Sequence, residues 1–144
     1  MNTPPDKLPP LVAIVDDEPD ITTFLGLALE DAGYRVMTIN DSASALALLR
    51  ERQPDLVCLD LLMPEQMGPS LYLQIRQLEE LRGVPVLILS GLGAQDHFQE
   101  LLSHAGQVPP PNGYVEKPVE SESFLDTVRS VLADQSALDA GGRS

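Results

Sequence analysis

Short apolar runs alternate along this chain with longer stretches in which apolar residues recur every three or four positions. In the first run, residues 11–15, every side chain is apolar, as in a strand that is buried on both faces. The stretch over residues 21–32 places its apolar side chains on one face of a helix, and Gly33 is a typical helix end. The chain therefore opens with a predicted strand and a predicted helix.

The same alternation continues to residue 133. Further strands are predicted at residues 34–39, 55–60, 84–89 and 113–115, and further helices at residues 42–52, 69–81, 94–105 and 121–133. Asp41 or Ser42 can cap the helix over residues 42–52. Five strand–helix units predict an α/β fold with a parallel sheet, because parallel strands need crossover connections, whose helices cover both faces.

The two ends of the chain differ in composition from the rest. Residues 1–10 contain four prolines, and residues 135–144 are mostly small or polar. Neither segment can bury enough apolar area to offset the entropy lost on ordering. We expect one domain over residues 11–134 with a flexible tail on each side, and the second tail could be a severed linker.

The charge balance excludes several classes of partner. The formal net charge is −13 at pH 7, which argues against direct binding to nucleic acid or to an anionic membrane surface. No apolar run approaches the length of a membrane span, and the first residues lack the apolar core of a secretion signal. The single cysteine, Cys58, excludes a disulfide framework and is expected to be a small core residue. We expect a cytoplasmic protein.

Polar side chains stand where the predicted strands end: Asp16, Asp17, Asp60, Ser90 and Lys117. The carboxyl ends of parallel strands share one edge of the sheet, where ligands bind in folds of this kind. Carboxylates gathered there repel one another unless a cation compensates, and oxygen ligands favour Mg²⁺ or Mn²⁺. An aspartate, a metal, a lysine and a hydroxyl together indicate phosphoryl chemistry, with the aspartate as nucleophile.

These residues occur in a recognisable order. The acidic pair follows the first strand, Asp60 precedes Met63-Pro64 and Gly68, a small residue follows Ser90, and Tyr114, Lys117 and Pro118 end the series. In this order and spacing they resemble the receiver domain of two-component response regulators, chemotaxis receivers included, over about residues 11–134. The resemblance implies a single (βα)5, flavodoxin-like three-layer sandwich with strand order 2-1-3-4-5.

The resemblance also assigns roles. It implies that Asp60 is the phosphoacceptor and that Asp16, Asp17 and Asp60 hold Mg²⁺, or Mn²⁺, with the backbone carbonyl of Leu62. Lys117 would contact the phosphoryl group, with a cis peptide bond between Lys117 and Pro118.

Receivers of this kind respond to phosphorylation through two switch residues, which would be Ser90 and Tyr114 here. A sensor histidine kinase or a histidine phosphotransfer protein would supply the phosphoryl group. The face formed by residues 94–105, 113–115 and 121–133 would then contact a downstream protein or form a phosphorylation-linked homodimer. The resemblance implies a signalling protein and not an enzyme, with Mg²⁺-dependent self-phosphorylation and slow self-dephosphorylation only.

Two features that concern partner choice and phosphoryl lifetime depart from the common pattern of the family. The chain is several residues longer between Ser90 and Lys117, where Pro109–Pro111 favour a stiff segment and could alter partner choice. Leu62 and Leu92 stand where polar residues position a hydrolytic water in some receivers, so we expect a long-lived phosphoprotein. His97 and His104 are seven residues apart on one predicted helix, and no third ligand at a metal-binding spacing accompanies them.

Two rival functions stay open at this stage. A haloacid-dehalogenase-type phosphatase shares the parallel sheet, the magnesium and the aspartate nucleophile, but carries Asp-x-Asp after the first strand, whereas Asp16 here precedes Asp17 and Glu18. A scaffold that keeps the fold without using phosphorylation is the second rival. The intact acidic residues, Ser90 and Lys117 argue against it.

Overall fold

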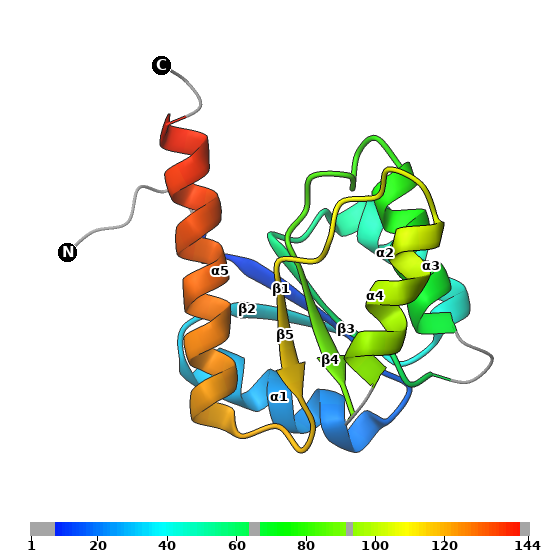
Figure 1. The fold of residues 1–144 in the computed structure, drawn as a ribbon. Helices are drawn as coiled ribbons and strands as arrows, with labels where there is room; N and C mark the ends of the chain where they lie inside the picture. Colours follow the sequence, from blue (N-terminus) through cyan, green and yellow to red (C-terminus); the bar gives the residue numbers. More distant parts are fainter. Residues whose placement is uncertain (1–7, 64–66, 92–93, 142–144) are drawn as a thin grey trace.

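The computed structural model describes residues 8–63, 67–91 and 94–141, and these form five strands and five helices (Figure 1). In chain order the elements are β1 (Leu11–Val15), α1 (Pro19–Asp31), β2 (Arg35–Ile39), α2 (Ser42–Arg52), β3 (Leu56–Asp60), α3 (Met67–Gln77), β4 (Val86–Ser90), α4 (Ala94–His104), β5 (Gly113–Glu116) and α5 (Ser121–Gly141). Of the two capping residues that the sequence allows, Asp41 caps α2 by accepting a hydrogen bond from the Ala43 N–H. The alternation of strands and helices is confirmed.

The five strands make one parallel sheet in the order β2-β1-β3-β4-β5. This is the order that the resemblance implies. The register aligns Val15 with Leu59, and Asp60 with Leu89, so the carboxyl ends of β1, β3 and β4 lie at one edge. Residues that directly follow different strands are thereby brought close together.

Helices cover both faces of the sheet, with α1 and α5 on one side and α2, α3 and α4 on the other (Figure 1). Two apolar clusters fill the two spaces between the layers. Along β1, Val12 and Ile14 pack toward α1 and α5, while Ala13 and Val15 pack toward α2, α3 and α4. Both faces of the strand are buried, and this explains why its sequence is apolar throughout.

The helix predicted over residues 69–81 is shorter at its end than expected. The structure ends α3 at Gln77, and residues 78–83 form turns in which the Leu81 N–H donates to the Leu78 carbonyl. Apolar residues at Leu78 and Leu81 keep a helical spacing without continuing the helix, because both still pack on the core from the turns. Apolar spacing alone does not distinguish a continuing helix from turns whose leucines pack on the core.

Phe24, placed by its spacing on the inner stripe of the first helix, is 47% exposed. The side of α1 that meets the sheet is centred on Leu25 and Leu29, both fully buried. Phe24 lies at the edge of this buried face. The apolar stripe predicted from the sequence is therefore wider than the face of α1 that the sheet covers.

The structure describes part of each segment that the sequence predicts to be flexible. The chain was expected to be loose from residue 135 onward, but α5 continues to Gly141. Residues 135–140 contain neither proline nor glycine, and extending an existing helix costs little free energy. At the other end, the carbonyls of Pro9 and Pro10 accept hydrogen bonds from the Arg35 side chain and backbone at 2.8 and 2.9 Å. Residues 1–7 and 142–144 lie outside the described part.

None of the helices in the described part of the chain has the length and apolar character that crossing a lipid bilayer requires.

Candidate functional site

The structure brings three of the predicted site residues into direct contact at the carboxyl edge of the sheet. Asp16 follows β1, Asp60 ends β3, and Lys117 follows β5. The Lys117 Nζ lies 3.3 Å from Asp16 Oδ2 and 3.1 Å from Asp60 Oδ1. Both carboxylates are buried, so one lysine ammonium is shared between two buried anions.

The turn after β1 is held by hydrogen bonds from three directions. The Asp16 N–H donates to the Ile39 carbonyl, and the Glu18 N–H donates to Asp16 Oδ1. The Asn40 side-chain amide donates to the Asp16 carbonyl at 2.8 Å and to Thr22 Oγ1 at 3.0 Å. Sequence reasoning missed Asn40, although it directly follows the second predicted strand and so lies at the same edge.

Glu18 is a second residue that sequence reasoning missed. Carboxylate oxygens of Asp16, Asp17 and Glu18 all lie within 4.8 Å of one another. Asp17 is half-buried and Glu18 is exposed, so the cluster reaches from the buried site to the surface. The signal was present in the sequence as an unbroken acidic run.

The two oxygens of Asp60 have different surroundings. Oδ1 accepts a hydrogen bond from the Leu62 N–H at 3.0 Å and pairs with Lys117. Oδ2 is buried and has no hydrogen-bond partner among the described residues. A buried carboxylate oxygen without a partner is costly, and such an atom is typically explained by a catalytic role or by a bound ion.

Burial is the main reason that the pKa of Asp16 rises from 3.8 to about 6. The negative charge of Asp60 raises this pKa further, while the Glu18 N–H and Lys117 lower it. For Lys117, burial lowers the pKa, but the hydrogen bond and charge of Asp60, together with Asp16, outweigh burial and leave the pKa raised. The lysine therefore stays a cation, and the site favours an additional positive charge.

Ser90 and Tyr114 are placed differently. Ser90 is buried at the end of β4, and its carbonyl accepts a hydrogen bond from the Lys117 N–H at 2.7 Å. The peptide bond between Lys117 and Pro118 is cis, as the resemblance implies. Tyr114 lies inside β5 opposite Ile88, half-buried against the cluster on the α2, α3 and α4 side, and burial raises its pKa. Tyr114 is thus set back from the edge where the carboxylates meet.

A family model described as the response regulator receiver domain matches residues 12–129. The chain belongs to this family. The polar-differentiation response regulator DivK of Brucella anthropi is 30% identical over 128 residues, which are 88% of this chain and 99% of DivK. The DNA-binding dual master transcriptional regulator RpaA of Synechocystis is 36% identical over 85% of this chain. The chain spans about half of the length of RpaA, 49%.

Solved structures agree with this assignment. The chemotaxis response regulator CheY4 of Vibrio cholerae has a TM-score of 0.74 and 27% identity, over 87% of this chain and 99% of CheY4. Receiver domains are in general non-catalytic signalling domains that bind Mg²⁺ at an acidic pocket and interact with histidine kinases and downstream effectors. The phosphatase and the scaffold are not favoured.

The start of α3 packs directly on the backbone of Asp60 in this receiver domain. A Cβ added at Gly68 would lie 2.5 Å from the Asp60 carbonyl oxygen and 2.7 Å from Leu61 Cα. Backbone atoms cannot move aside as a side chain can. Only glycine at position 68 allows α3 to approach the backbone of Asp60 and Leu61 this closely.

We expect Gly68→Ala to lower the free energy of unfolding by about 1 to 3 kcal/mol, because the added methyl group overpacks the segment. Gly83→Ala is the matched control, since a Cβ there meets nothing within 4 Å and is expected to cost less than about 0.5 kcal/mol. Urea denaturation of both variants checks the difference. Equal stability of the two variants would contradict the close packing at Gly68.

Proposed function

We propose that Asp60 accepts a phosphoryl group from the phosphohistidine of a partner protein. The observation that carries this proposal is the state of its carboxylate: Oδ1 is engaged by Lys117 and the Leu62 N–H, and Oδ2 has no partner among the described residues. In the transfer, a bond forms between Oδ2 and phosphorus while the bond from phosphorus to the donor nitrogen breaks. Asp60 thereby becomes an aspartyl-phosphate.

The donor set fits a hard divalent cation. Asp16, Asp17 and Asp60, with the backbone carbonyl of Leu62, would hold Mg²⁺, and Mn²⁺ could take the same place. Support comes from the raised pKa of Asp16, which shows that this buried acidic site favours an added cation. When bound, the metal neutralises the carboxylates and the oxygens of the transferring phosphoryl group.

The remaining site residues act on the phosphoryl group once it is attached. Lys117 is already within ion-pair distance of Asp60 and would turn its ammonium to the new phosphoryl oxygens. The Ser90 hydroxyl would donate a hydrogen bond to one of them, and Tyr114 would move inward with β4 and β5. The group adds about −1.5 to −2 charges and three strong acceptors, which bias these residues toward a second state.

This second state would be presented to a partner by the face that α4, β5 and α5 form. The phosphodonor would be a sensor histidine kinase or a histidine phosphotransfer protein in the cytoplasm. The output would be contact with a downstream protein or a phosphorylation-linked homodimer. Residues 11–134 would be the functional domain.

Incubation with acetyl phosphate and Mg²⁺, followed by intact-mass measurement, tests the proposal. We expect one phosphoryl adduct per chain, and none when EDTA removes the metal. A generic phosphomonoester such as p-nitrophenyl phosphate should not be turned over continuously, which separates a receiver from a phosphatase. Sustained turnover, or an adduct that is independent of metal, would contradict the proposal.

We also propose that the aspartyl-phosphate is long-lived because Leu62 offers no polar group to position a hydrolytic water. Its side chain is 59% exposed beside the site, and Leu92, the other leucine implicated, lies outside the described residues. Leu62→Asn is expected to shorten the phosphoprotein half-life by about tenfold, because water would be better oriented. Leu27→Asn, at an equally exposed leucine of α1, should leave the half-life unchanged. Equal half-lives for the two variants would refute this explanation.

A further inference from the structure

The side chain of Asn40 joins the ends of three elements at the carboxyl edge of the sheet. Asn40 directly follows β2, and the register of the two strands places it beside Asp16 at the end of β1. Its amide donates to the Asp16 carbonyl at 2.8 Å and to Thr22 Oγ1 of α1 at 3.0 Å. Thr22 Oγ1 in turn donates to the Pro19 carbonyl at 3.0 Å. The two N–H groups of one amide thus hold the segment between β1 and α1 at both of its ends.

This segment carries the acidic cluster of Asp16, Asp17 and Glu18, whose carboxylate oxygens lie within 4.8 Å of one another. From Asp17 to Asp20 every residue is half-buried or exposed, and Glu18 makes no side-chain capping bond to α1. The Asp16 carbonyl belongs to the peptide group that leads to Asp17, so fixing this carbonyl fixes the direction in which Asp17 leaves the strand. Beyond Asp16, polar contacts therefore do the work that core packing does elsewhere.

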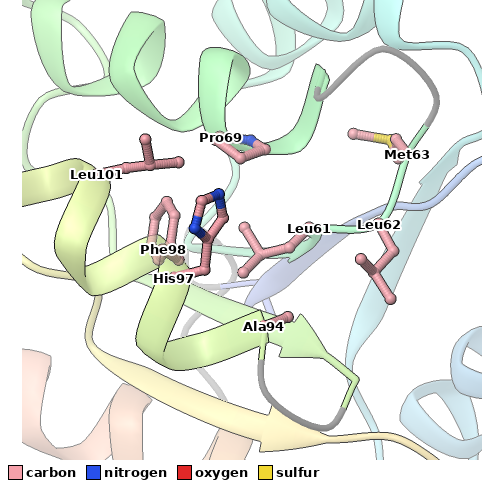
Figure 2. Close-up of a pocket in the computed structure, with 8 residues that line it drawn as sticks. All are labelled: Leu61, Leu62, Met63, Pro69, Ala94, His97, Phe98 and Leu101. Atoms are coloured by element: carbon pink, nitrogen blue, oxygen red, sulfur yellow. The ribbon is translucent and has the colours of Figure 1, made fainter.

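The loop that follows β3, on the other side of the proposed metal site, is fixed in a different way. Leu61 and Met63 are both 5% exposed, and Figure 2 shows Leu61 directed toward His97 and Phe98 of α4. Close packing against buried neighbours holds these two side chains in place. The loop after β1 has no fully buried side chain at residues 17–20, and the Asn40 amide takes the place of that packing.

We propose that Asn40 is a positioning residue of the divalent-metal site, acting through Asp16 and Asp17. This inference rests on the proposed function, which assigns Mg²⁺ to these carboxylates. Mg²⁺ demands near-ideal octahedral geometry, so carboxylates that are displaced from their places bind it more weakly. Hydrogen bonds that orient the ligands of a metal typically change its affinity by a factor of about 10 to 100.

The test is the binding of Mn²⁺ to the full chain without a phosphodonor, followed through the EPR signal of the free ion. Asn40→Ala should raise the Mn²⁺ dissociation constant at least about tenfold. Asn40 is exposed, so this change removes the two hydrogen bonds and leaves the apolar core intact. Thr22→Val removes only the second bond of the amide and should raise the dissociation constant by a smaller factor. Circular dichroism of each variant confirms that it is folded.

Asn40→Asp separates positioning from charge. Aspartate has nearly the size of asparagine, but an ionised carboxylate has no donor for the Asp16 carbonyl. It also adds a negative charge beside the site. Positioning predicts that this variant binds Mn²⁺ more weakly than the wild type, whereas attraction by charge alone predicts that it binds more tightly.

Asn112 provides the matched control at the opposite edge of the sheet. It directly precedes β5, and its Oδ1 accepts from the Val86 N–H at 3.0 Å and from Arg76 at 3.3 Å. Arg76 is almost fully buried and donates to four uncharged groups: the Arg82 and Val84 carbonyls, the Tyr72 hydroxyl and Asn112 Oδ1. Asn112→Ala therefore loses two hydrogen bonds, as Asn40→Ala does, and should leave the Mn²⁺ affinity unchanged.

The rate of phosphorylation by acetyl phosphate gives a second readout. At limiting Mg²⁺, Asn40→Ala should react more slowly than the wild type. At saturating Mg²⁺ its rate should return to within about twofold of the wild-type rate, because only the binding of the metal is impaired. A rate that stays low at saturating Mg²⁺ would overturn a role that is confined to the metal site.

Other results would also overturn this inference. Mn²⁺ affinity that is unchanged in Asn40→Ala, equally reduced in Asn112→Ala, or increased in Asn40→Asp would each do so, and the proposed function of Asp60 would stand. If the wild type itself binds no Mn²⁺, the proposed metal site is wrong and the role of Asn40 falls with it.

Discussion

Replacing Asp16 by asparagine is expected to stabilise the metal-free protein at pH 7 by about 1 to 3 kcal/mol. The pKa of Asp16 is raised from 3.8 to about 6, so the native state binds more protons than the unfolded state between these values. Stability therefore falls as the pH rises from about 4 to about 6, and the loss is complete above that range at roughly 3 kcal/mol. The asparagine side chain cannot ionise, yet it keeps an oxygen that can accept from the Glu18 N–H.

The measurement is urea denaturation in EDTA at several pH values. The advantage of Asp16→Asn should be largest at pH 7 and absent at pH 4, where the wild-type carboxyl is protonated. Asp126→Asn is the control, because Asp126 is 71% exposed at its side chain and should change stability by less than about 0.5 kcal/mol. A variant that is less stable than the wild type at pH 7 would show that Asp16 is not under electrostatic strain.

Lys117→Met should have the opposite effect and cost about 3 kcal/mol at pH 7. Methionine matches the length of the side chain but removes the ammonium that pairs with both Asp16 and Asp60. The lysine side chain is only 19% exposed, so the two buried anions lose a compensation that water does not replace. The cost should shrink toward pH 4, where the Asp16 carboxyl is protonated.

A surface pair provides the control for this result. Arg50 and Glu80 are 3.0 Å apart, with side chains 52% and 36% exposed, and Arg50→Met should cost at most about 0.5 kcal/mol. Asp16→Asn should stabilise the Lys117→Met variant by more than it stabilises the wild type, since the anion that it removes is then unpaired. Equal costs for Lys117→Met and Arg50→Met, or simple additivity of the double variant, would contradict the shared ion pair.

Much of this fold is predictable from the sequence because its three central strands, β1, β3 and β4, are buried on both faces. Continuous apolar runs such as residues 11–15 stand out against the helical periodicity that separates them. Element ends were less predictable, because Leu78 and Leu81 pack on the core from turns, and α5 continues through a stretch without apolar periodicity. The strand order itself came from the family resemblance.

The centre of the site followed from one rule, that residues at the carboxyl ends of parallel strands converge. That rule placed Asp16, Asp60 and Lys117 together, and it would also have found Asn40 had it been applied to the second strand. The rule could not reveal the network around Arg76. A buried cation whose acceptors are all uncharged, two backbone carbonyls and two side-chain oxygens, leaves no charge pattern in the sequence.

The most direct test of the account is the position of the phosphoryl group. The wild type, Asp60→Asn and Asp126→Asn are incubated with Mg²⁺ and acetyl phosphate, and their intact masses are compared. We predict one phosphoryl adduct on the wild type and on Asp126→Asn, and none on Asp60→Asn. An adduct of undiminished yield on Asp60→Asn would contradict the assignment of Asp60 as phosphoacceptor.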